Sequence, residues 1–213
     1  MSREYKGLLL ADGSSDRPLA DHAAELFAER GCTVLMVVPE LDRLTPPPAR
    51  TVEDQLRAAL RLDDGYDVLV VHRDAEGKKP MERTAEIANA VSALSCAQPH
   101  VPIVPVRMTE AWLLTDESTI RTVAGRPSGR QDLKLPPSRN VERINDPKEV
   151  LKAALIEASG LSGRHLDRFK QRFGEHRRQL LHRLDRNGPV CELQAWKDFV
   201  DAVDAAVAIL KSR

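Results

Sequence analysis

Residues 7–16 read GLLLADGSSD, and residues 66–77 read YDVLVVHRDAEG. Each stretch is a short apolar run that ends in glycine and acidic residues. Runs that are apolar throughout are typical of parallel strands buried between two layers of helices. In an open α/β sheet the ligand site lies beyond the carboxyl ends of the strands. We therefore expect the two acidic turns to lie together at one edge of a sheet.

Two further apolar runs continue the pattern, residues 32–38 (CTVLMVV) and 101–106 (VPIVPV). Helical stripes of apolar residues separate the four runs, at residues 19–27, 52–60 and 85–94. Strands that alternate with helices indicate parallel strands joined by crossover helices. The predicted fold class is α/β, with a mainly parallel sheet, flanking helices and an α-helical C-terminal extension.

Residues 1–124 are expected to form the α/β domain, residues 125–145 a loop or linker, and residues 146–213 a helical extension packed on the core. The boundary is placed at a stretch rich in glycine and proline. Helix starts and stops are signalled by capping residues and helix breakers. They are Thr51 with Asp54, Asp116, Asn145 or Asp146 ahead of Pro147, and Gly160. We also predict a bend near Gly174, a core position for Trp112, and surface positions for His165, His176 and His182.

The composition excludes several classes of protein. Lys plus Arg and Asp plus Glu both number 32, so the chain as a whole carries no large field toward nucleic acid or an anionic membrane. The 3 cysteines have irregular spacing and are expected to be reduced thiols. We see no signal peptide and no apolar run long enough to span a bilayer, so we expect a cytoplasmic protein without membrane contact.

The acidic turns suggest a metal site. Residues two apart in an extended segment point to the same side, so Asp74 and Glu76 can direct both carboxylates at one point. Mg²⁺ or Mn²⁺ suits such hard oxygen ligands, and Lys78 and Lys79 can contact a phosphate. The alternative is that these are ordinary solvated turns and helix caps. Asp16 in particular is either a site residue or the cap of the first helix.

The two acidic stretches resemble the motifs of Toprim domains. A third stretch, residues 105–116 (PVRMTEAWLLTD), resembles a segment of an uncharacterised Toprim-like domain family, and the resemblance covers nearly the whole chain. Toprim domains serve topoisomerases, primases and the overcoming-lysogenization-defect nucleases, where a strand-one glutamate and a strand-three Asp-x-Asp bind divalent metal. Asp12 stands here in place of that glutamate, and Glu76 in place of the second aspartate.

The resemblance implies a Toprim-like (Rossmann-like) fold and roles for individual residues. Asp12 would be a general acid/base or a metal ligand, and Asp74 and Glu76 would be ligands of Mg²⁺ or Mn²⁺. Glu110 follows the fourth apolar run and is expected to join the site as a catalytic or metal-binding residue; alternatively it is a first-turn acid of a helix. Arg107 is expected to face a substrate phosphate.

A basic region lies near the C-terminal end. Residues 164–186 hold 8 lysines or arginines against 3 acids. This region either follows a nucleic-acid backbone or is the solvated face of an amphipathic helix.

Three functions remain open from the sequence. The preferred one is a metal-dependent nuclease subunit that hydrolyses phosphodiesters of nucleic acid, expected to be DNA. By resemblance it would act with an ABC-type ATPase in defence against foreign DNA, as a monomer or a homo-oligomer. The alternatives are a non-catalytic regulatory module of an ATPase complex and an enzyme acting on a small phosphate ester. No P-loop, GxGxxG or Gly-x-Ser-x-Gly motif is present.

Overall fold

The four apolar runs form one parallel sheet in the computed structural model, which describes residues 3–213. The strands are β1 (Glu4–Leu10), β2 (Thr33–Val37), β3 (Val68–His72) and β4 (His100–Ile103). Their order in the sheet is β2-β1-β3-β4, and every pairing is parallel. Leu10 pairs with Val71, so the two acidic turns leave the sheet side by side. The prediction of an α/β fold with a parallel sheet is confirmed.

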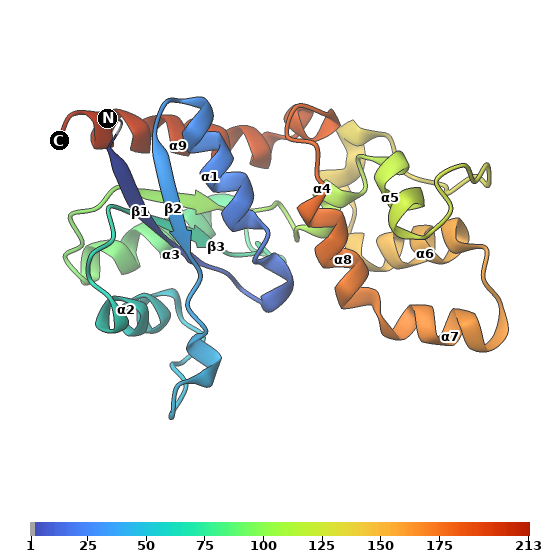
Figure 1. The fold of residues 1–213 in the computed structure, drawn as a ribbon, viewed down its shortest axis with the longest axis horizontal. Coiled ribbons are helices and arrows are strands. Elements are labelled where there is room, and N and C mark those ends of the chain that lie inside the picture. Colours follow the sequence, from blue (N-terminus) through green and yellow to red (C-terminus); the bar gives the residue numbers. More distant parts are fainter. Residues whose placement is uncertain (1–2) are drawn as a thin grey trace.

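Helices cover both faces of the sheet (Figure 1). Helices α1 (Leu19–Glu29) and α9 (Gln194–Lys211) share one hydrophobic core with alternate strand residues such as Leu9 and Val70. Helices α2 (Val52–Leu62) and α3 (Pro80–Ala93) share a second core with the intervening residues, such as Leu8 and Leu69. Alternate strand residues point to opposite faces, which explains why the strands are apolar throughout.

The remaining helices gather beside the carboxyl ends of the strands (Figure 1). They are α4 (Glu110–Leu113), α5 (Glu117–Val123), α6 (Pro147–Ser159), α7 (Gly163–Gln171) and α8 (Phe173–His182). Their core is continuous with the α1 and α9 face of the sheet. The Trp196 ring, on α9, lies edge-on to Trp112 and Phe199, with centroids 5.2 and 5.6 Å apart. The predicted core position of Trp112 is confirmed, because its side chain is fully buried.

Most of the predicted helix boundaries are confirmed. Thr51, Asp116 and Asp146 each accept a hydrogen bond at a helix start, from the backbone N–H three residues on. Gly160 ends α6 with φ 58°, a left-handed conformation that glycine adopts without strain. The bend near Gly174 corresponds to the break between α7 and α8.

One alternative is excluded and one prediction is wrong. Of the two alternatives for Asp16, the helix cap is excluded, because the N-cap of α1 is Pro18, which makes no side-chain cap hydrogen bond. His176 does not lie on the surface: it is buried, and its ring stacks on Phe169 with centroids 4.1 Å apart. Its aromatic neighbour lies on α7, across the break between the two helices, which the charged local sequence does not reveal. Across residues 3–213, no helix combines the length and apolar character needed to cross a bilayer.

Candidate functional site

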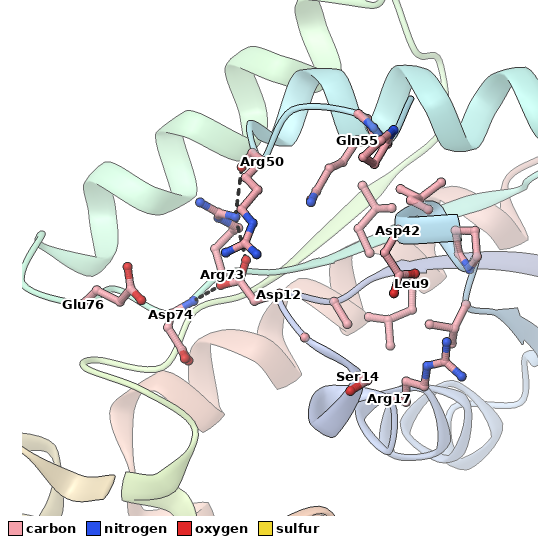
Figure 2. Close-up of a pocket in the computed structure, with 18 residues that line it drawn as sticks. Leu9, Asp12, Ser14, Arg17, Asp42, Arg50, Gln55, Arg73, Asp74 and Glu76 are labelled. Carbon is pink, nitrogen blue, oxygen red and sulfur yellow. Dashed lines mark hydrogen bonds and ion pairs between the residues drawn. The ribbon is translucent and has the colours of Figure 1, made fainter. Parts of the chain in front are cut away.

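A cavity of about 640 Å³ opens at the carboxyl ends of β1 and β3. Its lining includes Asp12, Asp74 and Glu76 from the two acidic turns, together with Arg50 and Arg73. The far wall comes from the segment after β2, around Asp42 and three prolines, and from Gln55 of α2 (Figure 2). The sheet topology thus brings three of the predicted site residues to one cavity, although 60 residues of sequence separate the two turns.

Asp12 is bound tightly by the turn that follows β3. Its Oδ1 accepts a hydrogen bond from Arg73 Nη1 at 2.6 Å, and its Oδ2 accepts one from the Asp74 N–H at 3.0 Å. The same Arg73 nitrogen lies 3.4 Å from the carbonyl oxygen of Arg50 (Figure 2). Both oxygens of Asp12 therefore have protein partners.

Asp74 turns its carboxylate away from Asp12, toward the start of α4 (Figure 2). Its Oδ1 accepts hydrogen bonds from the Thr109 N–H at 3.0 Å and from the Thr109 hydroxyl at 3.3 Å. Burial opposes the charge of this carboxylate, but His72, Arg177 and the Thr109 N–H outweigh it and lower the pKa of Asp74. Asp74 is therefore ionised at neutral pH.

His72, the last residue of β3, is fully buried beneath the acidic turns. Its Nε2 lies 3.0 Å from Thr109 Oγ1 and 3.3 Å from Asp74 Oδ1, and its Nδ1 lies 4.0 Å from Asp16 Oδ2. Burial opposes protonation of the imidazole, but Asp74, Asp16 and Asp12 outweigh it and raise the pKa of His72. His72 thus links the strand ends through charge rather than through apolar packing.

A second arginine, Arg177 of α8, joins two other acids of the same edge. Its Nε donates to Glu110 Oε1 at 2.8 Å, and its Nη2 donates to Asp16 Oδ1 at 2.7 Å. Its Nη1 donates to the Ser15 hydroxyl. Arg177, Asp16 and Glu110 are all buried. Arg177 belongs to the basic region, so at this position the prediction of a surface cation is wrong.

The structure therefore separates the predicted acids into two groups. Asp12, Asp74 and Glu76 line the cavity, whereas Asp16 and Glu110 are held by Arg177 and do not line it. Burial of unpaired carboxylates is costly, so the guanidinium between them has a clear structural role. Glu110 is also the first residue of α4, as the helical alternative for it required.

Glu76 has an unusual backbone. Its φ is 53°, and residues other than glycine rarely adopt this conformation. Hydrogen bonds from the Ala75 and Glu76 N–H groups to the carbonyls of Pro105 and Arg107 hold the turn in place. The Glu76 side chain is 67% exposed, with Arg83 3.6 Å away. Such strain often accompanies functional sites, and here it directs a carboxylate outward from the turn.

The predicted phosphate-binding residues lie around this turn rather than inside the cavity. Lys78 is exposed, with its Nζ 3.6 Å from Glu86, and Lys79 is the exposed residue that precedes α3. Arg107 donates a hydrogen bond to Asn145 Oδ1 at 3.2 Å. None of the three is among the lining residues of the cavity.

The charges at this edge of the sheet do not balance. Among the residues that line the cavity, the carboxylates outnumber the guanidiniums; the carboxylates are Asp12, Asp42, Asp74 and Glu76, and the guanidiniums are Arg17, Arg50 and Arg73. A further cation would be electrostatically favourable here.

The side chains are nevertheless not arranged as a metal cage. Within residues 3–213, no three His, Cys, Asp or Glu side chains are placed to hold a metal ion together. Asp12 faces Arg73, Asp74 faces Thr109, and Glu76 faces outward. The donor types still fit Mg²⁺ or Mn²⁺, which commonly use one or two carboxylates and retain several waters.

Sequence reasoning overlooked His72, Arg73 and Arg177. His72 and Arg73 directly precede Asp74 in the quoted stretch, so their position after a buried strand was the available signal. Arg177 gave no such signal, because it contacts residues 161 and 67 positions away.

Comparison of the chain with protein-family models, with curated proteins and with solved structures yields no match. The functional argument therefore depends on the geometry of the site.

Proposed function

We propose that the chain is a Toprim-like, metal-dependent nuclease subunit that hydrolyses phosphodiesters of nucleic acid. One observation carries the proposal: Asp12 and Asp74, from two different strand ends, meet at a cavity of about 640 Å³ that also contains arginines. Carboxylates bind a divalent cation and arginines bind phosphate oxygens. A phosphodiester substrate needs both.

Asp12 and Asp74 would hold the Mg²⁺ or Mn²⁺ ion, with Glu76 as a third acid from the same turn. When bound, the cation polarises the phosphodiester and lowers the pKa of an attacking water. Asp12 is also the candidate general base, since it lies on the cavity wall. Glu110 would act on the site indirectly, through Arg177, which binds both Glu110 and Asp16.

Substrate phosphates would contact Arg50 and Arg73 in the cavity, and Lys78, Lys79 and Arg107 near its edge. Arg164, Arg168, Lys170 and Arg178 are exposed on the helical side of the molecule and can extend the contact along a nucleic acid. DNA as the substrate, an ABC-type ATPase as the partner and a role in defence follow from the Toprim resemblance.

The experiment is nicking of supercoiled plasmid by the purified chain with Mn²⁺. We expect Asp12→Asn and Asp74→Asn to reduce the nicking rate by about a hundredfold or more, since misplacement of a reacting group alone has that effect. Asp42→Asn is the matched control, because Asp42 lines the same cavity but makes no hydrogen bond or ion pair with the acidic turns among the described residues. Equal nicking by all variants would remove the assignment to this site.

A second function has one observation in its favour. Both Asp12 oxygens already have protein partners, so this carboxylate is hydrogen-bonded without a cation. A non-catalytic module that regulates an ATPase complex would need only these hydrogen bonds within the protein and no bound cation. No heat of binding with Mg²⁺ or Mn²⁺ in calorimetry, together with no nicking by the wild type, would favour the module.

A further inference from the structure

Within residues 3–213, Arg73 is the only side chain that donates a hydrogen bond to the Asp12 carboxylate, and its own hydrogen bonding is incomplete. Among the described residues only Nη1 makes hydrogen bonds. Within the same part of the chain Nε is buried without a partner, and Nη2 lies 4.0 Å from Glu86 Oε1. The Nε and Nη2 edge of a guanidinium is one that can bind two oxygens of a phosphate or carboxylate at once. In Arg73 this edge has no acceptor within hydrogen-bonding distance.

A second arginine faces the same cavity without a partner. The guanidinium of Arg50 makes no ion pair or hydrogen bond among the described residues, and Arg50 is exposed at the cavity wall. Its carbonyl oxygen lies 3.4 Å from Arg73 Nη1, so the two arginines are adjacent. An anion in the cavity could thus meet the free guanidinium of Arg50. It would reach the unused edge of Arg73 only when Arg73 moves, because Nε is buried.

Arg73 and a metal ion would compete for the same oxygen of Asp12. A guanidinium 2.6 Å from Oδ1 occupies the position from which a cation would approach that oxygen. Two positive charges at such separations repel strongly where water is partly excluded, and the Arg73 side chain is only 16% exposed. Release of Arg73 from Asp12 would therefore open the carboxylate to a metal.

We propose that Arg73 exchanges between Asp12 and a phosphate group of the substrate, and so couples phosphate binding to divalent cation binding. With neither bound, Arg73 neutralises Asp12. A phosphate held by Arg50 draws Arg73 from Asp12 and then binds its unused edge, and Asp12 becomes free to bind the cation. The inference rests on the proposed function for the presence of both ligands, but it requires no hydrolysis.

The coupling must be reciprocal, because binding free energies are linked. Inorganic phosphate should tighten Mg²⁺ binding to the wild type, and Mg²⁺ should tighten phosphate binding by the same factor, about tenfold or more. A direct contact between metal and phosphate would also give coupling. Variants of the Arg73 and Asp12 pair separate the two causes.

The test is isothermal titration of the full chain with Mg²⁺, with and without saturating inorganic phosphate. In Arg73→Gln we expect Mg²⁺ to bind about tenfold more tightly than in the wild type without phosphate, and phosphate to add little. In Asp12→Asn we expect phosphate alone to bind more tightly, since Arg73 is free. Arg17→Gln is the matched control: Arg17 lines the cavity but pairs with Glu40 at 2.9 Å.

The proposal is overturned if Arg73→Gln binds Mg²⁺ no more tightly than the wild type, or if the coupling persists undiminished in that variant. Thermal melting of each variant establishes that it is folded. If Arg73→Gln does not fold, the phosphate affinity of Asp12→Asn decides alone, and an unchanged affinity rejects the exchange. Absence of plasmid nicking would contradict the proposed nuclease and leave these affinities intact, so the two failures are distinguishable.

Discussion

Two arginines neutralise acids at the same edge of the sheet, and they do so in different surroundings. Arg177 is buried, and its Nε, Nη1 and Nη2 atoms all donate to acceptors on Glu110, Ser15 and Asp16. Arg73 borders the cavity and uses Nη1 alone. A fully satisfied buried guanidinium is part of the framework, whereas a partly satisfied one beside a cavity is free to change partner. Charge pairing by itself therefore does not identify a functional site.

The largest effect is expected for Arg177→Met. This change leaves Asp16 and Glu110 buried without their cation, and loss of one partner of a buried ion pair costs about 3–5 kcal/mol. Denaturant unfolding measures the free energy of unfolding. The control is Arg172→Met, five residues earlier, where the pair with Glu175 is 60% exposed on both sides and should contribute at most about 1 kcal/mol.

The triple variant Asp16→Asn, Glu110→Gln, Arg177→Met sharpens this expectation. It removes the uncompensated charges, so we expect it to be about 1–3 kcal/mol more stable than Arg177→Met alone. A triple variant that is no more stable than the single one would show that Arg177 acts through packing and not through charge.

The next largest effect is expected for His72→Asn, whose loss of stability should depend on pH. The pKa of His72 is raised in the folded state above 6.5. Its contribution to the free energy of unfolding is therefore fully present below pH 6.5 and is lost as the pH rises through the folded pKa. Asp74 must stay ionised, and its lowered pKa ensures this above pH 3.8. In chelator-treated protein we expect the variant to lose about 1.5–3 kcal/mol below pH 6.5 and less at alkaline pH.

His22 provides a control of opposite sign. Burial lowers its pKa, so the wild type loses stability as the pH falls below 6.5, and His22→Asn should not. The difference between the wild type and His22→Asn therefore decreases on acidification, while the difference for His72→Asn increases. Parallel pH profiles for the two variants would contradict the charged environment of His72.

The smallest stability change is expected for Arg73→Gln. Its pair with Asp12 borders the cavity, and Gln can still donate to Asp12, so the loss should be that of one hydrogen bond, about 0.5–1.5 kcal/mol. The measurement is again denaturant unfolding, run beside Arg177→Met. Equal losses of unfolding free energy in Arg73→Gln and Arg177→Met would contradict the view that Arg73 is exchangeable and Arg177 structural.

Local sequence patterns predicted most of the fold. The four strands follow from the apolar runs. The helix starts follow from capping residues such as Thr51 and Asp146, which bond to a backbone N–H only three positions away. The parallel sheet predicted that Asp12 and Asp74 lie at one edge, because the carboxyl ends of its strands meet there. Arg73 directly precedes Asp74, so its place at that edge was also predictable, but its bond to Asp12 depends on how the turn directs the side chain. Arg177 lies 161 positions from Asp16 and could not be predicted as its partner. The burial of Arg177 depends on how α8 packs, which a basic local sequence conceals.

The binding of a divalent cation by the acids at the strand ends is tested most directly by diffraction. Crystals soaked in Mn²⁺ with inorganic phosphate would be measured for anomalous scattering. We expect a manganese peak at ligand distance from Asp12 and Asp74, about 2.0–2.3 Å, with Arg73 turned from Asp12 toward the phosphate. The contradicting result is no peak at these carboxylates, with Arg73 still bound to Asp12.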